Sequence, residues 1–459
     1  MGLRRSTLKD SRLIYEPNVR EVVRSRALLN EGKFFALWLS QGLSQTAQNA
    51  LLFGLLVIVL GITNSSIHTS LLILSFILPS IPLGFAVGVI LDRVNKGPIL
   101  VATNLIRAGF CVLLFFFHDN EWIIYAISMG IATASLFFNP AVVSLIPQVV
   151  KKERLVQANS LYNFTLTGAQ LIGIVFLAPI ALKSFGADGM FILATAMFVV
   201  AAIAAARLSL EPEKHEARST TGQMFGGIPT EFRESWKALT ADRRSVLALG
   251  QLIISSTLVL LFAILIPRYM RDVIEVPADS AALVFAPTGI GALVGLRFIP
   301  MFAKNGKNRV VVIGLAGIAV CLVLLALVNP IADVWKSAPD SLDPSRFLRV
   351  SLLQALVMCF AGPMGFFYAF LNAPAQTVLH ERAPPEMRGR IFATQVVSAN
   401  FLSLVPLLAI GAITDVLNVT VVLLLLAAVV GGVAALSRWM EEKDTLETQD
   451  ERMPQGVGT

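Results

Sequence analysis

Charged residues are scarce in this sequence. Asp, Glu, Lys and Arg make up 15% of its 459 residues, whereas 55% are hydrophobic, and the mean hydropathy is +0.72. Soluble domains carry about a quarter charged residues, and their cores stop growing near ~250–300 residues. A soluble fold is therefore excluded, and a lipid bilayer is the solvent that suits this composition.

Cysteine, histidine and catalytic motifs are also scarce. The three cysteines, Cys111, Cys321 and Cys359, lie in apolar runs and suggest neither a disulfide framework nor a cysteine metal site. The four histidines lack metal-ligand spacing, and no P-loop, nucleophile elbow or His-Glu-x-x-His motif occurs. We therefore expect no catalytic residues, no metal and no cofactor, and the sequence does not predict an enzyme.

Apolar runs long enough to cross a bilayer are abundant. A transmembrane helix needs ~20 mostly apolar residues, and a helix satisfies its own backbone polar groups in lipid, whereas an open strand does not. The sequence thus predicts an all-α membrane protein of about twelve transmembrane helices. The predicted spans are 34–62, 69–91, 98–117, 122–147, 157–182, 189–206, 246–267, 278–302, 310–329, 348–378, 391–414 and 417–437.

The distribution of Lys and Arg predicts the orientation of these helices. With the N-terminus inside, the cytoplasmic segments hold 29 of the 37 Lys and Arg residues, and the external loops hold 5. Cytoplasmic loops of membrane proteins carry an excess of positive charge. Both termini are therefore predicted to be cytoplasmic, and the net charge of +7 belongs to the membrane face and not to a nucleic-acid site.

A polar stretch at 207–245 divides the predicted spans into two sets of six. Its part 229–245 has apolar residues at helical spacing, so it is either a helix on the inner leaflet or a solvated linker. The predicted organisation is a cytoplasmic tail at 1–33, a six-helix bundle at 34–206, a cytoplasmic linker at 207–245, a second six-helix bundle at 246–437 and a cytoplasmic tail at 438–459.

The two halves contain a weak internal repeat. The tripeptide NPA at 139–141 recurs as APA at 373–375, and Arg154 recurs as Arg388, both 234 positions later. In both copies a span ends on its inner side in a basic loop that contains proline. Two similar six-helix halves are typical of transporters built from parallel repeats, so we predict two pseudo-repeat bundles.

The loop after the second span carries a recognisable motif. Its sequence, Gly88-Val-Ile-Leu-Asp92-Arg93-Val-Asn95-Lys96-Gly97, resembles the major facilitator signature Gly-x-x-x-Asp-Arg/Lys-x-Gly-Arg/Lys-Arg/Lys, with matches at Gly88, Asp92, Arg93 and Lys96. The resemblance implies that this acid and its basic neighbours latch the cytoplasmic ends of the bundles while the cavity is open outward. Asn95 replaces the usual glycine, and asparagine tolerates left-handed backbone angles. An ordinary basic loop is the alternative.

Further stretches resemble one branch of that superfamily, the exporters of drugs, macrolides and siderophores such as enterobactin. They are Phe34–Gln41, Pro140–Asn159 and Pro374–Arg390. The resemblance implies proton-driven export across the plasma (inner) membrane. Exporters often carry a Gly-Pro pair in the fifth span, whereas Gly173 and Pro179 stand apart here, which weakens the expectation of outward antiport.

Arg107 lies about ten residues into the third span. At 1.5 Å per residue this is roughly 15 Å deep, and an ionisable residue at that depth indicates a functional role. Because side chains lean toward a helix N-terminus, we predict that Arg107 and Asp92 belong to one ion-pair network of the latch. Snorkelling toward the headgroups is the alternative.

Amide side chains predict which helices line a central cavity. In the first span they recur at helical spacing, and amides that face lipid are unfavourable. The tenth span adds soft and aromatic side chains that suit a bulky amphiphile. Hydrogen bonding between helices, without substrate contact, is the alternative for each residue. The predicted cavity and substrate residues are Gln41, Gln45, Gln48, Asn163, Gln170, Gln251, Gln354, Phe367, Tyr368 and Asn372.

These features together favour a secondary active transporter that moves an amphiphilic organic solute by alternating access, as an exporter and a monomer. Uptake, or transport of a lysophospholipid-type lipid, is the alternative within transport, and a non-transporting membrane sensor is the alternative outside it. The resemblance implies protons as the coupling ion, but no Asp or Glu lies mid-span, where burial would raise a carboxyl pKa. Asp92 is the acid we favour for that role, ahead of Asp415.

Overall fold

The computed structural model describes most of the chain, and every regular element that it describes is a helix. The predicted all-α fold is therefore confirmed for these residues. Asp92, Arg93 and much of the two predicted tails and the linker lie outside them. The described residues are 31–91, 94–151, 154–208, 233–234, 236–237, 239–240, 242–277, 281–303, 306–335, 351–382 and 388–450.

The first half of the chain forms a set of helices that we name the N-terminal group. Its second predicted span is divided in two where Pro79, which has no backbone N–H, follows Leu78. The group comprises α2 (Gly32–Thr63), α3 (Ser66–Ile77), α4 (Ser80–Leu91), α5 (Lys96–Phe117), α6 (Glu121–Val149), α7 (Leu155–Leu171), a π-helix (Ile172–Leu177) and α8 (Ala178–Ala206).

The predicted fifth and sixth spans form one continuous helical stretch with a break at Gly186. Its φ of 69° and ψ of −167° interrupt α8, and only glycine adopts such angles readily. The part before Gly186 completes the fifth span and the part after it is the sixth. The described helices include eleven long apolar stretches, and dividing this one at Gly186 gives the twelve spans that the sequence predicts.

The second half forms the C-terminal group. Its last helix continues to Asp450, so residues 438–450 of the predicted C-terminal tail are helical. The short α13 begins at Val328, at the end of the predicted span 310–329, and continues into the connection that follows it. The group comprises α10 (Arg243–Asp272), α11 (Ala281–Phe302), α12 (Lys307–Ala326), α13 (Val328–Trp335), α15 (Leu352–Arg382), α16 (Arg388–Val416) and α17 (Val419–Asp450).

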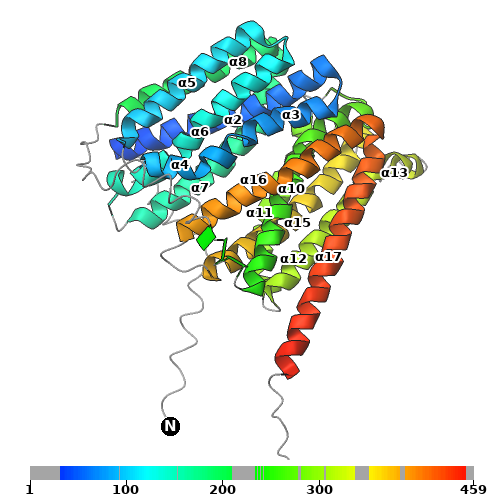
Figure 1. Ribbon diagram of the computed structural model, residues 1–459. Helices are drawn as coiled ribbons and strands as arrows, with labels where there is room; N and C mark the ends of the chain where they lie inside the picture. The colour runs from blue at the N-terminus through cyan, green and yellow to red at the C-terminus, as the bar shows by residue number, and fades with distance from the viewer. Residues whose placement is uncertain are drawn as a thin grey trace, which may run out of the picture.

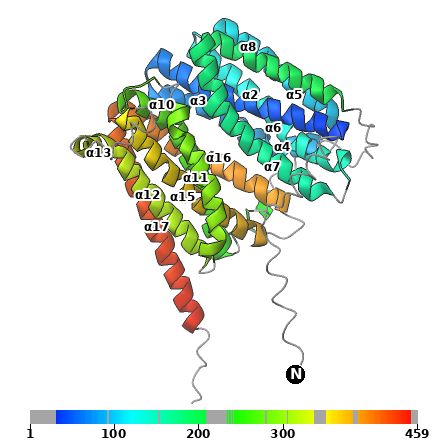
Figure 2. The same cartoon turned by 180° about the vertical axis from the view of Figure 1, so that it is seen from behind.

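The two groups meet near one end and diverge toward the other (Figures 1 and 2). Across the groups, α16 packs along α3 and α4, α10 contacts α2 and α3, and α11 touches the π-helix. The ends that meet are where α3 begins and where α10 and α16 finish. In the predicted orientation these are the outer ends, so the described helices are joined outside and splayed inside.

Candidate functional site

The amide row on α2 bonds to neighbouring helices of its own group. Gln45 donates a hydrogen bond from Nε2 to Oδ1 of Asn139 on α6. Gln41 donates to the backbone oxygen of Tyr162 on α7, at 3.5 Å. Gln41 and Gln45 are buried, whereas Asn139 is exposed. The structure thus places two of the predicted cavity residues inside the N-terminal group, and the Gln45 bridge reaches its surface at Asn139.

Arg107 is fully buried at the centre of the N-terminal group. Its guanidinium donates to Oε1 of Gln48 on α2 at 3.2 Å, and to Asn104 at 3.0 Å and the Thr103 backbone oxygen at 3.2 Å on its own helix. The rings of Phe138 on α6 and Phe198 on α8 lie 4.4 and 4.9 Å from its guanidinium carbon. Arg107 therefore ties four helices of one group together.

The structure does not describe Asp92, so the predicted pairing of Asp92 with Arg107 stays a prediction. Arg93 lies outside the described residues as well, and Gly88 lies within α4. Lys96 is the first residue of α5. Asn95, the substituted glycine position, has φ −64° and caps α5 by accepting a hydrogen bond from the Gly97 N–H at 3.4 Å. Left-handed geometry, for which we expected asparagine to be suited, is not used there.

A second polar bridge joins α10 to α15 in the C-terminal group. Asn372 donates from Nδ2 to Oγ of Ser255 at 2.8 Å, and its amide lies 3.4 Å from the Tyr368 hydroxyl. Gln251, one turn before Ser255, donates to Oδ1 of Asn308 on α12 at 2.7 Å. The sequence reading missed Asn308, which stands in the first turn of a span and resembles an ordinary loop-end residue.

The bridges in the two groups correspond to one another. Gln41 and Gln45 precede Gln251 and Ser255 by 210 positions. Asn139 is the first residue of the NPA tripeptide, and Asn372 immediately precedes the APA tripeptide at 373–375. Each group thus links the first and fourth helix of its half by a neutral polar contact, and α2 and α10 also contact each other across the groups. This arrangement places uncharged hydrogen-bonding groups on the first and fourth helices of each half.

The remaining predicted cavity residues take other positions. Gln354 lies in the first turn of α15, where its Oε1 accepts the Ser351 N–H at 2.9 Å while its own N–H donates to Ser351 Oγ at 3.2 Å. This reciprocal pair is a capping box, so the structure uses Gln354 as a helix cap and not as a cavity residue. The pattern Ser-x-x-Gln could have revealed it.

Phe367, Gln170 and Asn163 complete the predicted set. A Cβ atom added to Gly317 of α12 would lie 2.2 Å from the Phe367 ring, so this ring packs directly against α12. The Phe367 ring also makes a T-shaped contact with the ring of Phe366. Gln170 is exposed on α7, and the side chain of Asn163 is outside the described set. The structure therefore brings Tyr368 and Asn372 to one face of α15 and Phe367 to another.

Ion pairs at the predicted inner ends join helices within a group. Arg154 pairs with Glu31 at 2.8 Å between the starts of α7 and α2. Arg382 at the end of α15 pairs with Asp242 at 2.6 Å, just before α10, and Lys307 on α12 pairs with Glu381 on α15. These contacts hold each group together where the two groups diverge.

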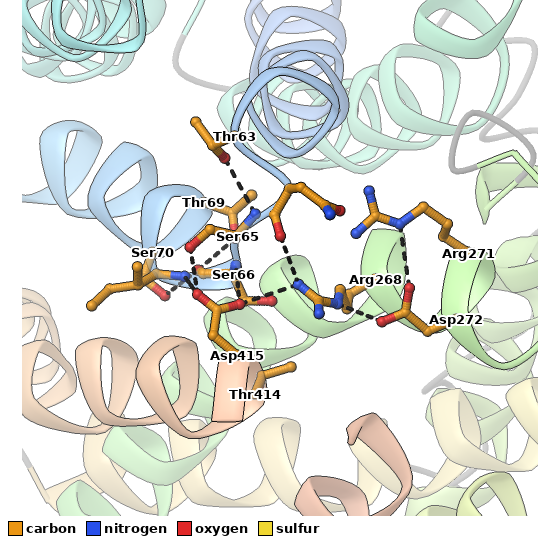
Figure 3. A network of polar contacts seen from close by, with 12 residues as sticks. Thr63, Ser65, Ser66, Thr69, Ser70, Arg268, Arg271, Asp272, Thr414 and Asp415 are labelled. Atoms are coloured by element: carbon orange, nitrogen blue, oxygen red, sulfur yellow. Dashed lines mark hydrogen bonds and ion pairs between the residues drawn. The ribbon is translucent and has the colours of Figure 1, made fainter. Parts of the chain in front are cut away.

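A polar network at the outer ends joins the two groups (Figure 3). Asp415 on α16 accepts hydrogen bonds from the backbone N–H of Ser66 at 2.6 Å and of Ile67 at 3.1 Å, and from the Ser65 hydroxyl. Arg268 on α10 donates to Asp415 at 3.1 Å. The sequence predicts Asp415 near the outer surface, as the second candidate for a proton-accepting acid after Asp92, and gives no sign of these partners.

Arg268 extends this network to the end of α2. Its Nη1 donates to the backbone oxygen of Asn64 at 3.1 Å, and its Nε pairs with Asp272 one turn later on α10. Arg271 also pairs with Asp272 at 3.3 Å. The charged side chains of α10 therefore hold Arg268 toward the N-terminal group. Among the described residues, no group of three or more His, Cys, Asp or Glu side chains could hold a metal ion.

Comparisons with known proteins agree with this architecture. The family model described as Major Facilitator Superfamily matches residues 37–342. The uncharacterized MFS-type transporter YjbB of Bacillus subtilis (strain 168) is 28% identical over 385 residues, which cover 80% of this chain and 85% of that protein. A second uncharacterized MFS-type transporter of the same organism, YkuC, is 28% identical over 138 residues, 30% of this chain and 32% of YkuC.

Solved structures share the fold at low sequence identity. The nucleoside transporter NupG superposes with a TM-score of 0.69 at 12% identity, over 89% of this chain and 98% of its own. A bacterial homologue of the human lysosomal transporter Spinster, solved in an inward-facing and unoccupied conformation, gives a TM-score of 0.64 at 14% identity over 90% and 97%. At these identities the likeness concerns the fold alone.

Proposed function

This chain belongs to the Major Facilitator Superfamily and is a multi-pass membrane transporter rather than an enzyme, and we propose that it exports an amphiphilic organic solute across the plasma membrane by alternating access. The proposal includes cytoplasmic termini, function as a monomer, and the two six-helix bundles at 34–206 and 246–437 as the moving bodies.

One observation carries the alternating-access part of the proposal. Contacts between the two groups gather toward their outer ends, where Asp415 meets Ser66 at 2.6 Å. At the inner ends, the charged side chains of Arg154 and Arg382 bond within their own groups. Two rigid groups joined at one end and splayed at the other form one of the two states that rocking of the bundles requires.

The side chains of the central bridges support an amphiphilic solute. Gln45, Asn139, Ser255 and Asn372 offer amide and hydroxyl groups without charge. Arg107, although mid-membrane, is fully buried among its own hydrogen-bond partners and two aromatic rings. A neutral polar site is suited to a solute held by hydrogen bonds and apolar contact more than by ion pairing.

Export is favoured by the resemblance to the exporter branch, and the splayed inner ends are compatible with it. A state open to the cytoplasm receives solute from inside, and reorganisation to an outward-open state would then release it. Protons are the coupling ion that we propose, with the carboxylates at the ends of the spans as acceptors. No described mid-span carboxylate offers an alternative.

Flux into proteoliposomes with imposed proton and sodium gradients tests this proposal. The panel should include amphiphilic cations, neutral amphiphiles, nucleosides and a lysophospholipid, in vesicles whose protein orientation has been determined. We expect proton-dependent movement of an amphiphile from the cytoplasmic to the outer face. Inward movement, or movement of the lysophospholipid alone, would replace export with one of the two alternatives, and no flux of any solute would favour a sensor.

A pair of variants on α15 tests the polar bridge in the same assay. Asn372→Ala removes the donor to Ser255, and we expect flux to fall about tenfold, since a buried polar partner is left unpaired. Thr377→Ala is the matched control, because the Thr377 hydroxyl bonds to the Ala373 backbone oxygen of its own helix at 2.8 Å and lies at an exposed position. Equal loss in both variants would show that Asn372 has no special part in transport.

A further inference from the structure

The first turn of α3 is capped by a residue of the opposite group. A helix N-terminus leaves N–H groups without intrahelical partners and carries partial positive charge. Ser65 stands at the N-cap with extended backbone angles, yet its side chain makes no cap bond to its own helix. Asp415 accepts the N–H groups of Ser66 and Ile67 in its place, from almost 350 positions away in the chain.

Arg268 completes the surroundings of this carboxylate. Its guanidinium donates both to Asp415 and to the backbone oxygen of Asn64, so one cation bonds to both groups. The side chains of Arg268 and Asp415 are only 17% and 24% exposed. Charge-assisted hydrogen bonds that are partly shielded from water are stronger than exposed ion pairs. The carboxylate therefore has four donors, of which three belong to the N-terminal group.

Close packing of two helices accompanies the cap. One turn before Asp415, a Cβ placed on Gly411 would lie 2.1 Å from Oγ of Ser70 and 2.9 Å from the Ser66 backbone oxygen. Glycine at 411 thus allows α16 to approach α3 directly beside the capped turn. Separating the outer ends of the two groups requires both this packing and the cap to be broken together.

We propose that Asp415 is the outer gate residue of this transporter, a carboxylate that closes the outer ends by capping α3 across the two groups. Release of Asp415 from Ser66 and Ile67 then accompanies opening to the outside. Arg268 positions the carboxylate, and Asp272, which contacts only α10 residues among the described ion pairs, holds Arg268 in turn. The inference rests on the alternating access proposed above.

The test measures access to a cysteine placed under the cap. Ser70→Cys is introduced into a background in which Cys111, Cys321 and Cys359 are replaced by serine. Ser70 is fully buried where α3 meets α16, and a membrane-impermeant thiol reagent added from outside can reach it only when the outer ends part. Ala47→Cys, at a fully buried position inside the N-terminal group, reports any unfolding.

Asp415→Asn keeps the shape of the side chain but removes its charge and one acceptor. We expect labelling of Ser70→Cys to accelerate about tenfold, the change in open population that corresponds to losing one helix cap. Asp119→Asn is the matched control, since it removes an equal charge at the predicted outer side from a side chain that is 96% exposed and outside this network, and its labelling rate should stay within about twofold of the parent.

The outcomes separate this inference from the proposed transport activity, because labelling requires no solute. A parental labelling rate in Asp415→Asn, with Ala47→Cys protected, overturns the gate. If Ala47→Cys is labelled in the Asp415→Asn background, that variant has partly unfolded. Arg268→Gln, which loses the bonds to both Asp415 and Asn64, is then tested in its place. Accelerated labelling of Ser70→Cys in that variant supports the gate, and a parental rate rejects it.

Discussion

Arg107 on α5 donates a hydrogen bond to the side-chain oxygen of Gln48 on α2, 3.2 Å away. The same oxygen accepts the hydroxyl of Ser135 on α6 at 3.0 Å. A residue predicted for the latch and one predicted for the cavity thus form a single structural junction within the N-terminal group. This junction ties α5, α2 and α6 of that group together.

Replacing Arg107 should therefore affect stability as well as transport. Arg107→Ala removes the buried donor to Asn104 and one donor to Gln48, which keeps the Ser135 hydroxyl, and we expect a loss of about 2–4 kcal/mol in the free energy of unfolding. Arg107→Lys should recover only part of it, because an ammonium cannot reproduce the directional bonds of the guanidinium. Thermal unfolding in detergent measures the effect. Arg297→Ala, at an exposed position, is the control and should unfold like the wild type.

Asp92→Asn should impair transport without preventing insertion. The resemblance to the family motif implies that this acid belongs to a cytoplasmic latch, so we expect its neutralisation to remove a stabilising contact of the outward-open state and to leave the apolar spans unchanged. We expect at least a several-fold loss of flux at equal abundance in the membrane fraction. Asp119→Asn, at a side chain that is 96% exposed, is the control. Wild-type flux from Asp92→Asn would make this residue part of an ordinary loop.

The inner ion pair of the C-terminal group predicts a pH-dependent contribution to stability. Burial would raise the pKa of Asp242, but hydrogen bonds from Arg382 and Ser245 outweigh it and hold that pKa below 3.8. A lowered carboxyl pKa stabilises the fold above the unfolded value and loses this effect as pH falls through the folded value. At neutral pH the Asp242→Asn variant should thus have a lower melting temperature than the wild type. This difference in melting temperature should disappear only below about pH 4. A difference independent of pH would exclude the charge as its cause.

The predicted orientation can be tested by cysteine labelling from outside in a background without native cysteines. Asp340→Cys, in the predicted external loop, should react with an impermeant reagent. Glu234→Cys, at an exposed helical position of the predicted cytoplasmic linker, should react only after the membrane is permeabilised. The physical basis is the excess of Lys and Arg on the predicted inner side. Labelling of Glu234→Cys in intact cells would reverse the topology.

The helices were predictable because the bilayer imposes length and apolarity on each span. The breaks at Pro79 and Gly186 follow from residue types that cannot continue a helix or that permit unusual angles. The hydrogen-bond partners of individual side chains were harder to predict. An amide in an apolar run, such as Gln354, is compatible with a cavity, a helix contact or a cap, and only its spacing from Ser351 distinguishes the cap.

The bond between Asp415 and Ser66 shows where a single sequence stops being informative. Both residues lie in short loops or helix ends with ordinary composition, and nothing local connects them. Their meeting depends on how α3 and α16 pack across the two groups, including the close approach at Gly411. Long-range pairing of this kind arises from tertiary packing, which one sequence without relatives does not encode in any readable spacing.

In the mechanism proposed above, the two groups rock about a shared centre, closing at one end as they open at the other. Spin-label distances at two pairs of exposed positions test it most directly: Lys151 with Thr240 at the inner ends, and Asp119 with Val334 at the outer ends. On adding a transported solute, or in Asp415→Asn, the inner distances should shorten while the outer distances lengthen. Distances that change at one end only, or at neither end, would contradict alternating access.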